Sequence, residues 1–122
     1  MLVVSRMASE AVIIGDTYTV TPRKISDRDI ILEIEANEPF YVDANGLAEV
    51  EQTADTATRF ECTLNLNGIV RIEEDLSILF VTARSVDAGT GYRARLGFES
   101  PRKTKLLCRY SDGREPKEFF LG

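Results

Sequence analysis

Histidine and tryptophan are absent from this 122-residue chain, and cysteine occurs only twice, as Cys62 and Cys108. Without histidine there is no Ser-His-Asp or Cys-His pair, and without a CxxC spacing there is no cysteine-based zinc site. These absences exclude most familiar hydrolase and zinc chemistry, so we expect no enzyme activity, no cofactor and no metal site. We expect both thiols to be buried and reduced.

Long hydrophobic runs are also missing. The apolar segments are far shorter than a membrane span, and Met1–Arg6 is not followed by the hydrophobic region of a signal peptide. We therefore expect a cytoplasmic protein without membrane association. The chain is long enough for one compact domain or two very small ones, and two such halves are expected to share a hydrophobic core.

Basic residues are scarce in the first half of the chain. Residues 1–58 carry 4 Lys/Arg against 11 Asp/Glu, whereas residues 59–122 carry 11 against 9, and the net charge is −5. Six basic residues of the second half are opposed only by Glu99: Arg93, Arg95, Arg102, Lys103, Lys105 and Arg109. This basic strip permits contact with nucleic acid even though the whole chain is acidic.

Alternating apolar and β-branched residues predict an all-β chain. Strands are expected at 12–14, 17–21, 30–35, 40–42, 60–66 and from 69, with turns at Gly15-Asp16 and Asn67-Gly68. Residues 43–58, between the strands expected at 40–42 and 60–66, are rich in Ala, Glu, Gln and Thr. The spacing of Leu47 and Val50 there predicts a short helix followed by a linker.

The strand pattern of the first half recurs in the second. Residues 11–20 match 69–78 at an offset of 58, and residues 30–36 match 94–100 at an offset of 64. The offset grows because the connection over residues 85–92 is longer by the difference, and a loop insertion is a mild kind of divergence. We therefore predict two modules, residues 1–55 with the short helix and residues 56–122 with a C-terminal tail.

The opening segments Met1–Arg6, Glu10–Asp16 and Thr19–Thr21 resemble the start of the carbon storage regulator family (CsrA/RsmA), small bacterial regulators that bind messenger RNA. In the second half, Arg95–Pro101 is similar to the family's third strand and following turn, and Lys105–Arg109 to its fifth strand. Family members are five-stranded modules that dimerise by exchanging strands, with the first strand of one copy beside the fifth strand of the other. The resemblance therefore implies a single-chain, strand-exchanged pseudo-dimer.

The resemblance also implies an RNA site. In the family, an arginine near the end of the first strand and one at the end of the fifth strand contact a GGA motif in an RNA loop. Arg6 matches the first arginine. Counting from Pro101 places Cys108 at the second arginine position and Arg109 one residue beyond it, so either a β-bulge restores the pairing or Arg109 points to the wrong face. Guanidinium groups suit this role because they neutralise phosphate and bond guanine edges.

One composite site is expected to survive in this chain. Its candidate residues are Val4, Ser5, Arg6, Lys103, Lys105 and Arg109. The second site that a symmetric dimer would have carries Leu64 and Asp43-Ala44 at the two arginine positions, so we expect it to be lost.

Two functions from different classes remain open. The first is a translational regulator that binds the leader of a messenger RNA through the composite site. The second is an interaction module that has lost RNA binding and acts on a protein partner through an edge strand. On residue type alone, Arg6 and Arg109 are ordinary solvated strand residues, and assembly beyond a monomeric pseudo-dimer is left open.

Overall fold

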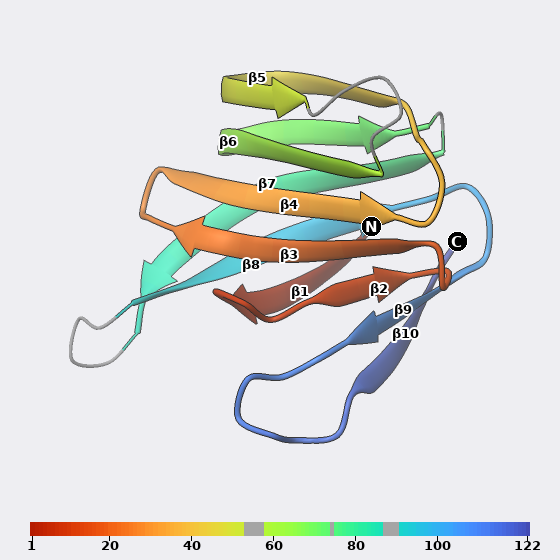
Figure 1. Cartoon of the computed structure of the whole chain (residues 1–122). Helices are drawn as coiled ribbons and strands as arrows, with labels where there is room; N and C mark the ends of the chain where they lie inside the picture. The colour runs from red at the N-terminus through yellow and green to blue at the C-terminus, as the bar shows by residue number, and fades with distance from the viewer. Residues whose placement is uncertain (53–57, 74, 87–90) are drawn as a thin grey trace.

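The computed structural model of the protein describes residues 1–52, 58–73, 75–86 and 91–122 (Figure 1). The strands are β1 (Leu2–Met7), β2 (Val12–Ile14), β3 (Tyr18–Ile25), β4 (Asp29–Ala36), β5 (Val42–Gln52), β6 (Arg59–Ile72), β7 (Leu76–Ser85), β8 (Tyr92–Glu99), β9 (Thr104–Cys108) and β10 (Lys117–Leu121). No helix occurs among the described residues. The all-β class that the alternating pattern predicts is confirmed.

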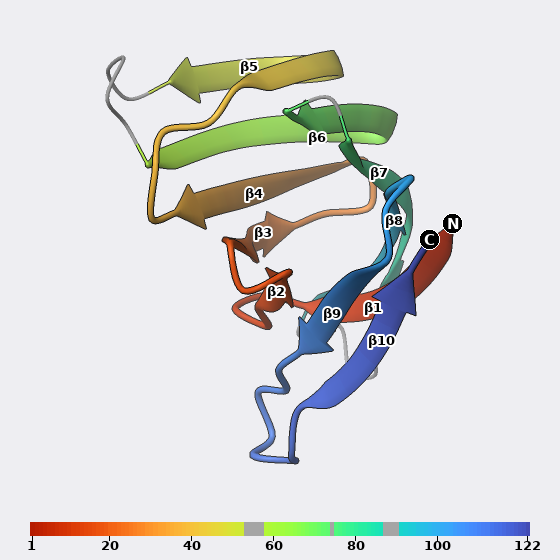
Figure 2. The ribbon, with the colours of Figure 1, turned by 90° about the vertical axis from the view of Figure 1, so that its right-hand side faces the viewer.

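All the strands belong to one antiparallel sheet that curls until it is nearly closed. Hydrogen-bonded neighbours follow the order β1-β8-β7-β6-β4-β3-β2-β9-β10, and β5 pairs with β6 outside that order. The constant twist between neighbouring strands curls a sheet of this size. As a result β1 and β10, the two ends of the order, approach each other, and the two chain termini lie close together in both views (Figures 1 and 2).

Strand β6 changes its neighbour halfway along. Its first part, Arg59–Asn65, pairs with β4, and its last part, Ile69–Ile72, pairs with β7. Between the two parts Asn67 has a φ of 66°, in the left-handed region that asparagine tolerates. The predicted turn at Asn67-Gly68 is therefore a bend inside one strand, which carries the chain from one wall of the curled sheet to the other.

The helix predicted within residues 43–58 is wrong, because β5 runs through most of this segment as a strand paired with β6. The spacing of Leu47 and Val50 fits one face of a helix, but β6 offers an edge whose backbone groups need partners. Ladder hydrogen bonds along that edge outweigh a weak local preference. Residues 53–57, which include the predicted module boundary, lie outside the described residues.

Strands from the two halves of the chain are interleaved. The first-half strands β2, β3 and β4 are neighbours, and they are flanked by β9 and by the first part of β6. The last part of β6 with β7 and β8 is flanked in turn by β5 and β1. Each group of three therefore borrows its outer strands from the other half of the sequence.

Both halves supply side chains to one hydrophobic core. Fully buried residues include Val12, Val20, Ile30, Leu32 and Ile34 from the first half and Leu64, Val70, Ile78, Phe80, Leu96 and Phe98 from the second. These positions alternate along their strands, as the pleat of a half-buried sheet requires. The apolar faces of the two halves together form one hydrophobic core. A half of roughly 60 residues is near the lower limit for a stable core of its own.

The two cysteines are buried and unpaired, as predicted. Cys62 lies on β6 and Cys108 on β9, strands that are not neighbours in the sheet. Burial raises the pKa of the Cys62 thiol to about 12 and also raises the pKa of Cys108. Both thiols therefore stay protonated, which makes them poor nucleophiles.

Candidate nucleic-acid interface

Arg6 is the most buried of the predicted site residues, with 2% of its surface exposed. Its Nε donates a hydrogen bond of 2.7 Å to the carbonyl of Ser5, and its Nη1 donates to the carbonyl of Arg109. The guanidinium carbon lies 4.8 Å from the centroid of the Tyr110 ring. The charge is thus held by backbone carbonyls and a ring face, and it ties β1 to the end of β9.

The other two predicted residues of β1 divide between the faces of the sheet. Val4 is 7% exposed and belongs to the core. Ser5 is half-buried and lies opposite Arg95 of β8, on the outer face. Val4 therefore supports the site by packing, and among the predicted residues of this strand Ser5 is the one that a ligand on the outer face can reach.

Arg109 lies just beyond β9, and its side chain is exposed. Its backbone N–H donates a hydrogen bond of 3.0 Å to the carbonyl of Ala11. No register shift interrupts the pairs that β9 makes with β2 and β10, so the side chains alternate regularly up to the buried Cys108. The bulge considered for this position is absent from the described ladder, and the Arg109 guanidinium faces solvent.

A buried carboxylate joins the loops on both sides of this contact. Glu10 Oε2 accepts hydrogen bonds from the backbone N–H and the hydroxyl of Ser111, at 2.9 and 3.1 Å, and Oε1 accepts from the N–H of Met7 at 2.8 Å. Burial alone would raise the pKa of Glu10, but these hydrogen bonds and the charge of Arg6 outweigh it and lower the pKa. An ionised Glu10 therefore holds the β9–β10 loop in place.

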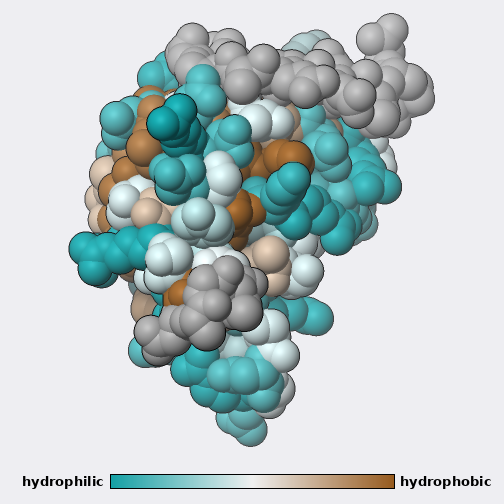
Figure 3. Space-filling model, turned by 90° about the vertical axis from the view of Figure 1, so that its left-hand side faces the viewer, coloured by the Kyte–Doolittle hydropathy of each residue, from teal (hydrophilic) through white to brown (hydrophobic). Residues whose placement is uncertain are grey.

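Tyr110 is half-buried beside Arg109 and contacts two guanidinium groups. The buried one belongs to Arg6, and the exposed one belongs to Arg114, whose guanidinium carbon lies 4.2 Å from the ring centroid. Arg114 Nε also lies 2.7 Å from a carboxylate oxygen of Asp112. The β9–β10 loop that carries these groups forms the hydrophilic projection at the lower end of Figure 3.

The two predicted lysines lie at the opposite end of β9. Lys105 is half-buried, with its Nζ 3.9 Å from Asp16 Oδ1, and Lys103 is exposed, with its Nζ 5.6 Å from the centroid of the Phe120 ring. At about 3.3 Å per residue, a strand places Lys103 about 20 Å from Arg109. The structure thus brings Arg6 and Arg109 together but keeps Lys103 apart from them.

The rest of the basic strip is divided as well. Arg93 and Arg95 are exposed on β8, opposite Met7 and Ser5 of β1. Arg102 follows β8, and its Nε lies 3.4 Å from Asp75 Oδ2. The strip is therefore no single patch: it occupies the outer face of β8, the β8–β9 connection and the end of β9.

Sequence reasoning missed Glu10, Ser111 and Tyr110. Glu10 and Ser111 are 101 residues apart, and no local pattern indicates that they meet. For Tyr110, the sequence offers one indication of a role at the site, namely its position directly after the predicted site residue Arg109. All three depend on the pairing of β9 with β2, which brings the two loops together.

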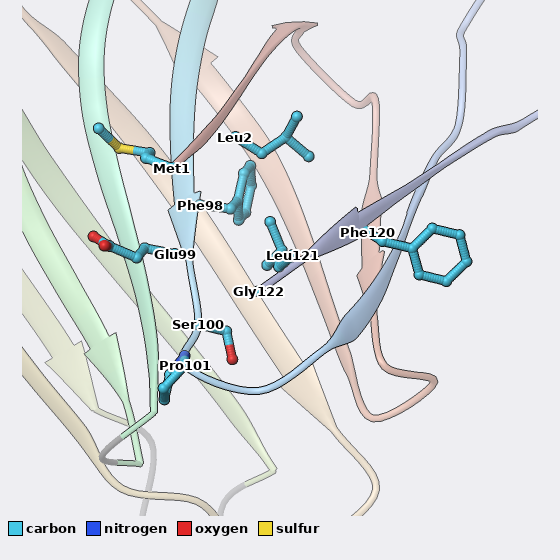
Figure 4. A pocket seen from close by; sticks show the side chains of 9 residues that line it. All are labelled: Met1, Leu2, Phe98, Glu99, Ser100, Pro101, Phe120, Leu121 and Gly122. Carbon is cyan, nitrogen blue, oxygen red and sulfur yellow. The ribbon is translucent and has the colours of Figure 1, made fainter.

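A pocket of about 510 Å³ opens between the two end strands of the sheet (Figure 4). It is lined by Met1, Leu2, Phe98, Glu99, Ser100, Pro101, Phe120, Leu121 and Gly122. No lysine or arginine side chain lines it, and it does not reach Arg109 or Tyr110. The pocket is therefore separate from the predicted RNA site.

No protein-family model, curated protein or solved structure matches the chain. Within the part of the chain that the structure describes, no group of three or more Cys, Asp or Glu side chains suits a metal ion. The same part contains no helix that is long and apolar enough to cross a membrane. The geometry around Arg6 and Arg109 is therefore the main guide to function.

Proposed function

We propose that the chain is a strand-exchanged pseudo-dimer of two five-stranded modules similar to those of the CsrA/RsmA family. The interleaving of the strands supports this proposal. The three central strands of the first module, β2, β3 and β4, are flanked by the first and fifth strands of the second, which are the start of β6 and β9. The central strands of the second module are flanked by β1 and by the start of β5. Residues 95–101 then correspond to the fourth strand of a module rather than the third. The expected pairing of the first strand of the first module with the fifth strand of the second is wrong, because β1 pairs with β8, and β9 pairs with β2.

The register of the ladders gives a second line of support. Val12 lies opposite Val20, and the residues 58 positions later, Val70 and Ile78, lie opposite each other. The register shift between Pro22 and Lys24 of β3 also recurs 58 positions later, between Phe80 and Thr82 of β7. Apolar patterns match by chance in β proteins, but residue-by-residue pairing and the place of a bulge are independent of composition.

The exchanged strands repeat in the same way. Leu2 of β1 lies opposite Phe98, and Phe60 of β6 lies opposite Ile34. Phe60 lies 58 positions after Leu2 in the first strand of each module, and Phe98 lies 64 positions after Ile34 in the fourth. The same two offsets align the sequences of the two halves. We attribute this agreement to a duplication within the chain.

On this architecture we propose that the protein is a non-enzymatic translational regulator that binds GGA-type leader RNA through one composite site. The observation that carries the proposal is the hydrogen bond from the Arg6 guanidinium to the carbonyl of Arg109, 103 residues away. It joins the first strand of one module to the end of the fifth strand of the other, where the resemblance implies an RNA site.

The two arginines have different roles in this proposal. Arg6 is a positioning residue, because its guanidinium is enclosed and already satisfied. Arg109 is the residue that reaches RNA, because its exposed guanidinium can bond a guanine edge or a phosphate. Lys105 on β9 and Lys103 just before this strand add positive charge for an RNA backbone that extends about 20 Å from Arg109. At the opposite pole the equivalent of Arg6 is Leu64, which is fully buried and carries no charge, so the second site is lost.

Binding of the full chain to a short RNA hairpin tests the proposal. We expect saturable binding to a hairpin with GGA in its loop, weaker binding when GGA is replaced by CCA, and affinity that falls as salt rises. Arg109→Ala should weaken binding roughly tenfold, which is typical for loss of one arginine contact to guanine.

Arg71→Ala is the matched control, because Arg71 is also exposed but lies on β6, the third strand from β1 in the sheet. It should bind the GGA hairpin like the parent chain. Failure of the parent chain to bind the hairpin at low salt would overturn the RNA-binding function. Equal losses for Arg109→Ala and Arg71→Ala would leave general charge as the cause and contradict the composite site.

A protein-binding function is the second candidate, and the free edge of β1 favours it. Among the described strands β1 pairs only with β8. Val3 on this strand is 44% exposed, and Met1 just before it is 68% exposed. Unpaired edges accept a strand from a partner. A tagged chain that recovers a protein but no RNA, and loses that protein on Val3→Lys, would support this candidate over the RNA-binding one.

A further inference from the structure

The β9–β10 loop presents an aromatic ring in a fixed position. The guanidinium carbon of Arg6 lies 4.8 Å from the centroid of the Tyr110 ring. The next residue, Ser111, is held by two hydrogen bonds to Glu10. Arg6 and Glu10 are themselves buried, so turning the ring away would break its contact with Arg6, and the Ser111 hydrogen bonds keep the adjacent backbone in place. A ring held in this way loses little conformational freedom when a ligand stacks on it.

The group that covers the ring on the solvent side is held weakly. The Arg114 side chain is 63% exposed, with its guanidinium carbon 4.2 Å from the ring centroid and its Nε paired to Asp112, which is 54% exposed. Gly113, at the tip of the loop, has nothing within 4 Å of the position of a Cβ atom. Exposed cation–π contacts and exposed ion pairs are weak compared with the stacking of a base on an aromatic ring.

The charges around the ring indicate which ligand it suits. Arg109 precedes Tyr110, and Arg6 and Arg114 contact its ring. The nearby Glu10 carboxylate is occupied by three hydrogen bonds, and the Asp112 carboxylate is occupied by Arg114. Because three guanidinium groups outnumber two carboxylates, the surroundings disfavour a cationic ligand and attract a flat, electron-rich ring that carries a phosphate. An unpaired nucleotide has both properties, and arginine planes and tyrosine rings both stack on bases.

We propose that Tyr110 is the base-stacking residue of the RNA site, with one unpaired base inserted between its ring and the Arg114 guanidinium. This inference rests on the RNA-binding function proposed above and adds what holds the base. In the bound state Arg114 covers the outer face of the base, and Arg109 contacts the neighbouring phosphate or guanine edge.

The absence of tryptophan from the chain allows a direct test. Tyr110→Trp in the full chain places the only tryptophan at the ring position, and its fluorescence is excited selectively over that of the remaining tyrosines. Its fluorescence is followed during titration with the GGA hairpin and with hairpins that lack one loop base at a time, while a gel-shift assay measures total binding independently. We expect the intact hairpin to quench the fluorescence and one abasic hairpin to bind about tenfold more weakly with little quenching.

The outcomes separate the two proposals. No gel shift with any hairpin overturns the RNA-binding function and the stacking inference together. A normal gel shift without quenching, or equal quenching by every abasic hairpin, overturns the stacking inference alone. Tyr110→Phe should bind like the parent chain, and Tyr110→Ala should bind about tenfold more weakly, with thermal unfolding measured to verify that it is folded.

Phe120→Ala is the matched control. Phe120 is 59% exposed and also has a cation near its ring, Lys103 at 5.6 Å, but it lies on β10. We expect this variant to bind the GGA hairpin with unchanged affinity. A tenfold loss for Phe120→Ala with no loss for Tyr110→Ala would assign stacking to the other ring and contradict the inference.

Discussion

Arg6 carries a charge at a position where only 2% of the residue is exposed. Burying a guanidinium is costly unless its donors are paired, and here they reach two backbone carbonyls and the face of a ring. In addition, no buried side-chain nitrogen or oxygen among the described residues lacks a hydrogen-bond partner. Arg6 therefore stabilises the contact between the two ends of the chain.

The different burial of the two arginines predicts different effects on stability. Arg6→Ala should lower the free energy of unfolding by about 1–3 kcal/mol, because it removes a buried partner and leaves the carbonyl of Arg109 unpaired. Arg109→Ala should change it by less than about 0.5 kcal/mol, because the side chain is exposed. Guanidinium chloride unfolding followed by circular dichroism measures both. Equal midpoints for the two variants would show that Arg6 is not a structural anchor.

At the scale of strands, a single carboxylate on β4 connects this strand with both of its neighbours in the sheet order, β3 and β6. Glu33 has 1% of its side chain exposed and forms ion pairs with Arg23 of β3, at 2.8 Å, and with Arg59 of β6. The hydrogen bond from Arg23 is the largest cause that lowers the pKa of Glu33, from an ordinary 4.5 to about 2. Three adjacent strands of one sheet therefore share one charged contact.

This network predicts how stability depends on pH. A carboxyl whose pKa is lower in the folded state stabilises the fold above its unfolded pKa, and this contribution is lost as the pH falls through the folded value. Glu33→Gln should therefore be about 1–3 kcal/mol less stable than the parent at pH 7, and the gap should shrink between pH 4.5 and about 2. Urea unfolding at several pH values measures the gap.

Glu35→Gln is the control on the same strand. The hydrogen bond with Glu33 raises the pKa of Glu35, so its ionised form is not favoured in the folded state. The Glu35→Gln variant should be as stable as the parent at pH 7 or slightly more so. A gap between parent and Glu33→Gln that stays constant from pH 7 to pH 2 would contradict the ion-pair explanation.

At the scale of the whole molecule, the interleaved strands make each half of the chain incomplete. The group β2, β3 and β4 has neither of its flanking strands within the first half, since β9 and β6 come from the second. The core likewise contains residues of both halves. Cooperative folding of the entire chain follows, because neither half buries its apolar faces alone.

Separate expression of the halves tests this dependence. Residues 1–55 and 56–122 should each lack a cooperative thermal transition, and mixing them in equal amounts should restore a transition and the β-sheet circular dichroism of the intact chain. Sedimentation is measured alongside to detect a half that pairs with a second copy of itself. A cooperatively folded monomer of either half would contradict the exchange of strands.

Much of the strand pattern follows from local chemistry. The β-branched and apolar composition of Val12–Ile14 and Ile30–Glu35 predicts strands, and both segments are strands in the fold. The predicted helix at 43–58 fails because the free edge of β6 supplies backbone partners that local sequence does not contain. Period-2 patterns report which face of a strand is apolar, whereas a segment without a clear pattern takes its structure from its neighbours.

The all-β class, the recurrence of the strand pattern and the burial of both thiols follow from the sequence alone, because side-chain type and order along the chain are sufficient for these. The folded chain is needed to show that Arg6 is buried while Arg109 is exposed, and that Tyr110 contacts Arg114 in a loop fixed by Glu10. Those roles depend on pairings between strands about 100 residues apart, and no local pattern encodes such distant contacts.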